Sequence, residues 1–329
     1  MRHKTGIRSV LLLLAAMIAA LFSGALLHVQ AQAQSIRLHA TLAPEDWTEP
    51  VLVKDINRES ARVHPLAASQ DALFFAADDG VHGRELWRTN GTANGTALVK
   101  DAWPGPACSQ ASYNCRPPVM VHAGDFLFLT LNDGEHGWEL WRSDGTDSGT
   151  TLVKDIFPGS SNGIDPQFGH TQLLVVDGVL YLAADDATNG IELWRSDGTE
   201  AGTWLVSDID AGESGSKPSG FVEMNGLLYF TAITDQAGRE LWRSDGTAAG
   251  TWMVKDVNPQ NSAYGAVGPL AVMGDNLYFK GRDERYGEEL WRSDGTEPGT
   301  VLGQGYKRGR QLRRAAGTNH RERIALLHS

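Results

Sequence analysis

The chain has 329 residues, enough for one large domain or two ordinary ones, and it is rich in glycine (37 residues) and tryptophan (10 residues). Ten of its Lys and Arg residues lie at positions 1–33 and 303–329, whereas positions 34–302 hold 19 basic and 39 acidic residues, a net charge of −20. Such an acidic body excludes binding to a phosphate backbone, so we expect no nucleic-acid partner.

The N-terminal segment predicts export. Three Lys and Arg residues among the first eight precede an apolar run at 10–27, and Ala31-Gln32-Ala33 supplies the small residues of a cleavage site. This layout is typical of a signal peptide at 1–33, followed by a short linker at 34–46, and it predicts a secreted or cell-surface protein. Because the apolar run of about 18 residues approaches the length of a membrane span, an uncleaved leader is the alternative and the only membrane contact that we expect.

Five copies of a unit of about fifty residues follow, each centred on a Glu-Leu-Trp motif. The motif residues are Glu85 and Trp87, Glu139 and Trp141, Glu192 and Trp194, Glu240 and Trp242, and Glu289 and Trp291. Polar groups that recur once per unit are better explained by a repeated structural task than by a single catalytic constellation. We therefore interpret these ten residues as structural.

The fourth copy indicates that one unit consists of four short strands. The ranges 219–224 and 227–232 flank the turn pair Asn225-Gly226, and the ranges 240–243 and 251–256 flank a turn that contains Asp245-Gly246. Asn-Gly and Asp-Gly favour tight hairpins because both residues tolerate positive φ. The second strand is apolar throughout, as expected when both of its faces are covered.

Four antiparallel strands per unit predict an all-β fold, a β-propeller of four-stranded antiparallel blades over residues 47–302, with about five blades in this chain. The alternative is an open β-solenoid, which needs shorter and more uniform rungs. The motif Glu and Arg lie on opposite faces of a blade, so we expect each to meet a partner from an adjacent blade. Residues 49–56 are an isolated copy of the fourth strand, which we expect to complete the last blade and close the ring.

The last 27 residues are basic and lose the repeat pattern. Back-translated with degenerate codons and read one nucleotide later, 303–309 permit Val-Lys-Asp-Ile-Asn-x-Gly, the continuation of the repeat. The same shift at 321–328 permits Val-Asn-Gly-Leu-Leu-Tyr-Phe-Thr, close to 224–231, and the two recovered motifs have the spacing of Asp208 and Asn225. We expect the tail at 303–329 to be a frame-shifted or wrongly sequenced reading of the next repeat, which makes this chain a truncated ring. The alternative is a genuine basic tail that forms a disordered arm.

The motif is long and specific. It reads Glu-Leu-Trp-Arg-Ser-Asp-Gly-Thr at 139–146, 192–199, 240–247 and 289–296, and the first copy, at 85–92, differs by Thr89 and Asn90. Over about 50–302 the chain thereby resembles the bacterial ELWxxDGT repeat family. The resemblance implies an exported or surface-associated protein without an assigned activity, and a looser similarity to kelch blades supports the propeller.

Few features occur only once. Cys108 and Cys115 predict a local disulfide in an oxidising compartment, since the Cys-x-x-Cys spacing of a redox pair is absent. Trp138 is also unique to the second unit, so we expect any specialised binding site there. The acidic loops at 78–80, 132–134 and 185–186 offer oxygen ligands for calcium but lack the spacing of a dedicated calcium loop, and turn formation is the alternative. No other cofactor is expected.

We expect a non-enzymatic extracellular or cell-surface binding or adhesion module, a monomer that recognises a protein or a glycan through loops on a propeller face. The alternative is a propeller-based glycan hydrolase or lyase with its site over the central channel. A single-copy pair of carboxylates, or a carboxylate and a histidine, converging there would favour the enzyme.

Overall fold

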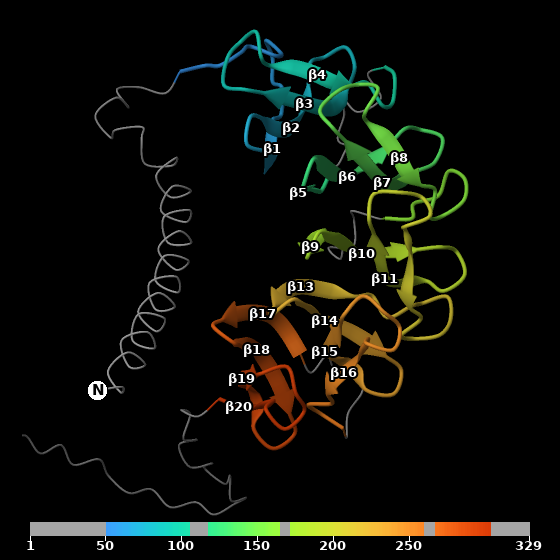
Figure 1. Ribbon diagram of the computed structural model, residues 1–329, viewed down its shortest axis with the longest axis vertical. Helices are drawn as coiled ribbons and strands as arrows, with labels where there is room; N and C mark the ends of the chain where they lie inside the picture. The colour runs from blue at the N-terminus through green and yellow to red at the C-terminus, as the bar shows by residue number, and fades with distance from the viewer. Residues whose placement is uncertain (1–50, 106–117, 165–171, 260–266, 304–329) are drawn as a thin grey trace, which may run out of the picture. The chain divides into compact units, whose positions relative to one another are not determined.

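The computed structural model describes residues 51–105, 118–164, 172–259 and 267–303, and throughout these ranges the regular secondary structure is β-strand (Figure 1). No helix long and apolar enough to cross a membrane occurs in these ranges. The predicted signal peptide, the linker at 34–46, the cysteine pair and the basic tail at 304–329 lie outside the described residues. The chain divides into units at 1–52 and 53–329, and every strand belongs to the second.

The strands form five sheets, each of which is one blade, numbered in chain order. Blade 1 holds β1 (His64–Ala68), β2 (Leu73–Asp78), β3 (Arg84–Thr89) and β4 (Ala97–Lys100); blade 2 holds β5 (Met120–Ala123), β6 (Phe126–Asn132), β7 (Trp138–Ser143) and β8 (Thr151–Lys154); blade 3 holds β9 (Leu174–Val176), β10 (Val179–Asp185), β11 (Ile191–Ser196) and β12 (Trp204–Ser207). Blade 4 holds β13 (Ser219–Met224), β14 (Leu227–Thr234), β15 (Gly238–Ser244) and β16 (Trp252–Lys255); blade 5 holds β17 (Val267–Met273), β18 (Asn276–Asp283), β19 (Gly287–Ser293) and β20 (Val301–Leu302).

Within every blade the four strands pair antiparallel in chain order, and the first strand of each blade contacts the first strand of the next. This is the predicted architecture, a β-propeller of four-stranded antiparallel blades. Blade 4 agrees closely with the predicted strands: β13 has the predicted bounds, and Asn225 and Gly226 turn the chain with φ values of 56° and 75°. The hairpin of β14 and β15 is longer than predicted, since its pairing continues to Thr234 and Gly238.

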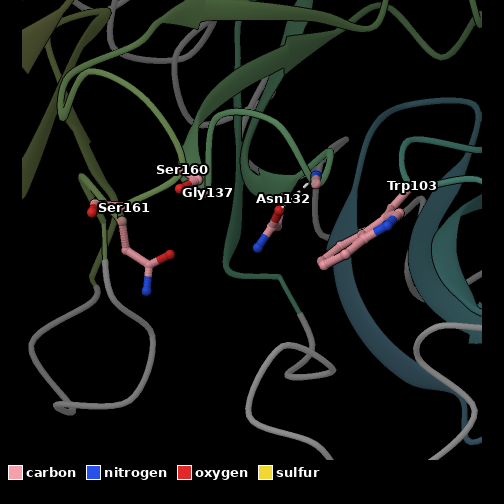
Figure 2. A pocket seen from close by; sticks show the side chains of 7 residues that line it. Trp103, Asn132, Gly137, Ser160 and Ser161 are labelled. Carbon is pink, nitrogen blue, oxygen red and sulfur yellow. Dashed lines mark hydrogen bonds between the residues drawn. The ribbon is translucent and has the colours of Figure 1, made fainter.

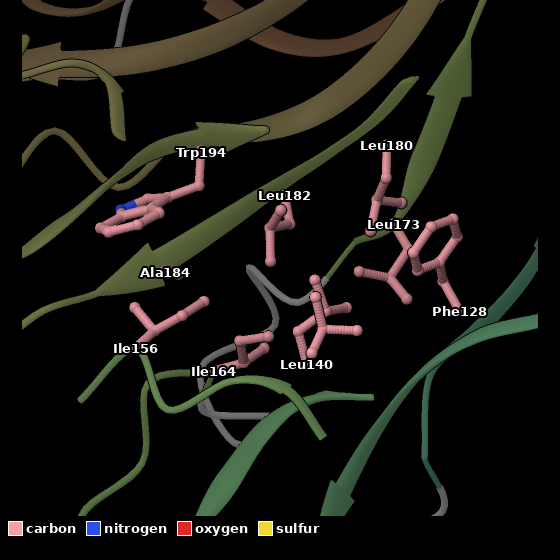
Figure 3. Packing of buried hydrophobic residues seen from close by; sticks show 10 residues of the cluster. Phe128, Leu140, Ile156, Ile164, Leu173, Leu180, Leu182, Ala184 and Trp194 are labelled. Carbon is pink, nitrogen blue, oxygen red and sulfur yellow. The ribbon is translucent and has the colours of Figure 1, made fainter. Parts of the chain in front are cut away.

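The hydrophobic core lies between consecutive blades. The motif leucines Leu86, Leu140, Leu193 and Leu241 are fully buried, and each belongs to a cluster with leucines of the next blade's second strand. Between blades 2 and 3, Leu140 belongs to one cluster with Leu180 and Leu182, and Ile156 from the connecting segment belongs to the same cluster (Figure 3). Full burial of a leucine contributes roughly 1.5–3 kcal/mol, so these clusters hold neighbouring blades together.

The sequence predicts that the leading copy of the fourth strand completes blade 5, and this prediction is wrong. That place is taken by β20, in which Leu302 pairs with Trp291. Residues 51–54 form no strand, but the segment that follows them covers blade 1. Ile56 and Ala61 pack against Phe75 and Trp87, as other connecting segments pack against later blades. The segment at 55–61 therefore occupies the place of a linker that arrives from a preceding blade.

Candidate ligand-binding site

The motif glutamates hold the segments that connect consecutive blades. The carboxylate of Glu139 accepts hydrogen bonds from the backbone N–H groups of Ile156 (3.0 Å), Phe157 (3.1 Å) and Gly163 (2.8 Å). Glu85, Glu192 and Glu240 accept bonds from the segments that leave their own blades. The partner of these four glutamates is thus the backbone of the outgoing linker, and not a group of the adjacent blade as the sequence predicted.

Burial changes the protonation of these glutamates. Removal from water raises the pKa of Glu85, Glu139 and Glu240 to about 8, even though the N–H donors favour the ionised form. Burial likewise raises the pKa of Glu192. Glu289 of blade 5 is only half-buried. The raised pKa values follow from a structural position that recurs in successive blades.

Two motif arginines reach the next blade, as expected. Nη1 of Arg142 donates to the carbonyl of Gly198 (3.0 Å), and Nη1 of Arg195 donates to the carbonyl of Gly246 (3.1 Å). The motif tryptophans lie on the opposite face and are largely buried, and their Nε1 groups have no hydrogen-bond partner. These positions support the interpretation of the motif as a packing element.

The acidic loops stabilise their own turns. Oδ1 of Asp79 accepts the N–H groups of Val81 and His82, and Oδ2 lies 2.7 Å from Nδ1 of His82. Asp133 and Asp186 make the corresponding contacts in blades 2 and 3. Among the described residues, no three His, Cys, Asp or Glu side chains are grouped to hold a metal ion. Turn formation therefore accounts for these aspartates.

A pocket of about 440 Å³ lies beside blade 2, within the size range of small-molecule sites. Three segments line it: the linker after blade 1, the loop between β6 and β7, and the linker after blade 2. The lining residues are Trp103, Asn132, Gly134, Gly137, Ser160, Ser161 and Asn162. Figure 2 shows Asn132 between the Trp103 indole on one side and the two serines on the other.

The β6–β7 loop is held in place before any ligand binds. Asp133 Oδ1 accepts the N–H groups of Glu135 (3.0 Å) and His136 (2.8 Å), and its Oδ2 lies 2.7 Å from Nδ1 of His136. Burial acts to raise the pKa of Asp133, but the hydrogen bonds from His136 and Glu135 outweigh it and the pKa is lowered. The same contact with Asp133 raises the pKa of His136. Both shifts favour the charged pair of Asp133 and His136, and this contact helps to fix the loop.

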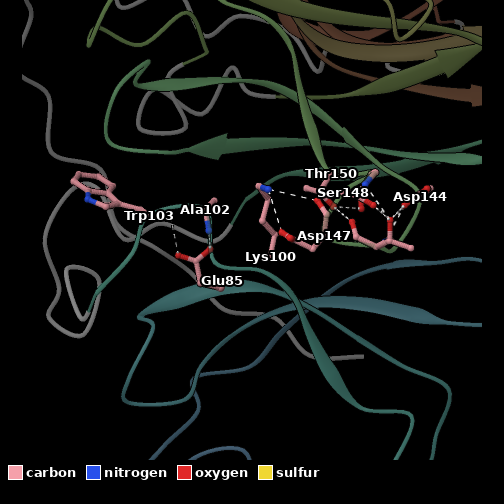
Figure 4. A network of polar contacts seen from close by, with 11 residues as sticks. Glu85, Lys100, Ala102, Trp103, Asp144, Asp147, Ser148 and Thr150 are labelled. Carbon is pink, nitrogen blue, oxygen red and sulfur yellow. Dashed lines mark hydrogen bonds and ion pairs between the residues drawn. The ribbon is translucent and has the colours of Figure 1, made fainter.

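The indole of Trp103 is positioned by blade 1. Glu85 accepts the N–H groups of Ala102 (2.9 Å) and Trp103 (3.4 Å), beside the ion pair of Lys100 and Asp147 that joins blades 1 and 2 (Figure 4). The ring lies against Gly134, where an added Cβ would come within 2.8 Å of the indole. Gly134 also has a φ of +82°, a conformation that favours glycine. Both the backbone and the ring contact therefore require glycine at this position.

The pocket combines one aromatic ring with amide and hydroxyl groups. Asn132 and Asn162 each use Oδ1 to accept an N–H of the surrounding loop, from Gly134 (2.8 Å) and Trp138 (3.0 Å) respectively, which fixes the orientation of both side chains. Among the residues that the structure describes, none that lines the pocket is an acid or a base. This described lining can therefore bind an uncharged polar ligand, and it offers no group of its own for general acid–base catalysis.

The pocket lies beside blade 2, the repeat in which the sequence predicts any specialised site, but its lining does not include the residues that the prediction named, and a binding site there stays a prediction. Trp138 is buried, and its backbone supports the pocket. Cys108 and Cys115 lie outside the described residues, so their disulfide stays a prediction. The sequence analysis did not single out Trp103. The signal that could have identified it is that Trp103 is the only tryptophan at its position in the repeat, where the other linkers have Asn57, Phe157, Asp210 and Asn258.

No family model matches the sequence, and no curated relative matches it. Among solved structures, the chain is similar to a puromycin hydrolase (15% identity over 73% of this chain and 37% of that chain, TM-score 0.45) and to oligopeptidase B from Leishmania major (14% identity over 80% and 36%, TM-score 0.44). It is also similar to TolB from Acinetobacter baumannii (10% identity over 72% and 53%, TM-score 0.38). The chain spans little more than a third of the length of the two hydrolases. These likenesses concern the fold alone.

The five four-stranded sheets and their repeated packing define a β-propeller protein. Within that class, the feature that distinguishes one blade boundary of this chain is the pocket around Trp103 and Asn132.

Proposed function

We propose that this chain is an exported, non-enzymatic β-propeller that binds glycans in the pocket beside blade 2. The observation that carries the proposal is the single-copy Trp103, held next to the amides and hydroxyls of Asn132, Asn162, Ser160 and Ser161. A pyranose ring has an apolar C–H face, which suits an indole, and a rim of hydroxyl groups, which suits amides. Export is supported by the signal-peptide layout, and the resemblance to ELWxxDGT repeats agrees with it.

Two further observations favour binding over catalysis at this site. The polar motif residues recur in successive blades and are engaged with linker backbone, which leaves them no separate catalytic task. The pocket is also pre-organised, since its loop and both linkers are anchored by Asp133, Glu85 and Glu139. A pre-formed site loses little conformational entropy when its ligand binds.

A glycan array followed by calorimetric titration of the best ligand tests the proposal on the purified, exported protein. We expect at least one class of neutral oligosaccharide to bind, and we expect Trp103→Ala to weaken that binding at least tenfold. Trp252→Ala is the matched control, because Trp252 is a partly exposed tryptophan of blade 4 that does not line the pocket. Its affinity for the glycan should equal that of the unaltered protein.

Two outcomes would contradict the proposal. The first is a correctly folded protein that retains no glycan on the array. The second is equal loss of binding in Trp103→Ala and Trp252→Ala, which would place the glycan elsewhere. Release of a shortened glycan during the titration would instead favour a hydrolase or lyase.

A further inference from the structure

Within the described residues, the face of blade 5 that would meet a following blade lacks the cover that every earlier blade has on that face. Leu290 is 58% exposed, whereas its four counterparts in the motif, Leu86, Leu140, Leu193 and Leu241, are each 0% exposed. Those four leucines are covered by the second strand of the following blade. Tyr278 of the same face is also more exposed than its counterpart Tyr229. Blade 5 thus presents the leading half of an interblade interface.

Blade 1 presents the complementary half. Leu73 is 38% exposed, whereas its counterparts Leu127, Leu180, Leu228 and Leu277 are at most 1% exposed. In each of the four formed interfaces, one of these counterparts shares a cluster with the motif leucine of the preceding blade. Leu73 therefore lacks the motif leucine of a preceding blade.

The strands of the repeat are also unequal in number within the described residues. Six segments have the sequence of a fourth strand, namely 51–54, β4, β8, β12, β16 and β20, but only five Glu-Leu-Trp strands are present to pair with them. Each Glu-Leu-Trp strand already has its partner, since β19 pairs with β20. The unpaired segment is 51–54, and its Val53 is 40% exposed, whereas the paired Val99 is 5% exposed.

The segment at 51–54 already makes the contact expected of a preceding blade. Nζ of Lys54 donates to the carbonyl of Thr96 in blade 1 (2.7 Å). Lys100 of blade 1 and Lys255 of blade 4 reach the same turn of the following blade, at the carbonyls of Asp147 and Glu297 (both 3.4 Å), which lie three positions earlier in that turn than the equivalent of Thr96. Lys54 therefore reaches the turn of blade 1 that the last lysine of a preceding fourth strand reaches in other blades.

We propose that a sixth copy of the repeat closes the ring, with its second strand packed on Leu290 and with residues 51–54 as its fourth strand. Its motif leucine then covers Leu73. Lys280 of the blade 5 face replaces Thr231 of blade 4, but its Nζ lies 3.3 Å from Glu288, so this charge is already paired and the apolar contact centres on Leu290.

The reading frame shifted by one nucleotide permits a sequence for the strand that would cover Leu290. Read one nucleotide later, the codons after Leu302 permit Val-Lys-Asp-Ile, which extends β20 to the length of the other fourth strands. The same frame then permits Val-Asn-Gly-Leu-Leu-Tyr-Phe-Thr at the spacing of a first turn and second strand. The second Leu of that run corresponds to Leu228, which packs beside Leu193 in a formed interface. The strand expected to cover Leu290 thus carries a leucine at the position that Leu228 holds in a formed interface.

Thiol labelling tests the closure on two products of the gene: the 329-residue chain, and the product of the shifted frame read on through the next Glu-Leu-Trp motif. Leu290→Cys and Val53→Cys are placed in each, and labelling is followed by mass spectrometry of the separate peptides. We expect both introduced thiols to react at least tenfold more slowly in the longer product. Leu241→Cys is the matched control and should be protected in both products.

Four results would overturn the proposal. Equal reactivity of the thiols from Leu290→Cys and Val53→Cys in the two products would mean that no sixth copy covers them. Protection in the 329-residue chain at every concentration would mean that its own blades close the ring, and protection only at high concentration would identify a second copy of the chain as the cover. Codons at 303–309 that forbid Val-Lys-Asp-Ile in the shifted frame would also exclude the occupant.

Discussion

At the level of single residues, the motif glutamate links the repeat to the pocket. Glu85 fixes the backbone of Trp103, and Glu139 accepts bonds from Phe157 and Gly163, which bracket the serines and Asn162 of the opposite wall. The side chains that build the propeller therefore also set the width of the site. A substitution in the motif should affect both stability and ligand binding.

Replacement of Glu139 by alanine should strongly destabilise the protein. The change leaves three buried N–H groups without an acceptor, and each such group costs about 1–3 kcal/mol. We expect a loss of about 3 kcal/mol or more in the free energy of unfolding, measured by urea denaturation. Glu135→Ala, at an exposed position of the same blade, should change it by less than about 0.5 kcal/mol. A similar loss in both variants would contradict this role of Glu139.

The sequence predicted the task of the motif residues better than it predicted the site. Recurrence alone indicated that the Glu and Trp positions are structural, because a property shared by five units cannot define one active centre. Asn132 and Asn162 gave no such signal, since each is one polar loop residue among many. Their proximity arises only when Glu85 and Glu139 bring the linkers after blades 1 and 2 to one loop.

At the level of elements, the loop between β6 and β7 depends on glycine for two separate reasons. Gly134 and Gly80 occupy the same position of their blades and have the same φ of +82°. An added Cβ would lie 2.8 Å from the Trp103 indole at position 134, but 3.2 Å from the Asn57 amide at position 80. The two glycines therefore share the backbone requirement and differ in the neighbouring side chain.

Gly134→Ala and Gly80→Ala should separate these two requirements. Both should lower the free energy of unfolding by about 1 kcal/mol, because alanine is disfavoured at this φ. Only Gly134→Ala should also displace the indole, and we expect it to weaken glycan binding several-fold in calorimetric titration. Unchanged affinity in Gly134→Ala would show that the ring position is not critical for the ligand.

Strand positions were largely predictable, because Asn-Gly and Asp-Gly turns mark where each hairpin reverses. The extension of β14 to Thr234 was not, since its polar end resembles a loop and is paired only because Gly238 lies opposite. The partner of 51–54 was wrongly assigned to blade 5. Sequence similarity identifies a segment as a fourth strand, but which blade it pairs with depends on a contact between distant parts of the chain.

At the level of the whole molecule, the buried glutamates make stability depend on pH. The pKa of Glu85, Glu139 and Glu240 is about 8 in the folded protein, well above the pKa of an exposed glutamate. At pH values between these two pKa values, the folded state binds more protons than the unfolded state. Stability should therefore be greatest near the lower limit and should fall as the pH rises through about 8.

Urea denaturation between pH 5 and pH 8 measures this dependence. Each glutamate can contribute up to about 1.4 kcal/mol per pH unit, and Glu139→Gln should remove the share of one group from the slope. Because the variant keeps the remaining charges, general repulsion within the acidic body cancels in the comparison. The same slope with and without Glu139 would show that its carboxyl group is already ionised in the folded protein at pH 5.

The hydrogen bonds between each motif glutamate and its outgoing linker also bear on how such a gene gains or loses repeats in evolution. One side of every boundary is specified by the Glu and Leu of one copy, and the other side by the second strand of the copy that follows. Unequal recombination that inserts or deletes one whole copy leaves each remaining boundary with the same pair of chemical partners. A gene of this kind can therefore gain or lose repeats without compensating substitutions, and related chains should differ in copy number more readily than in motif.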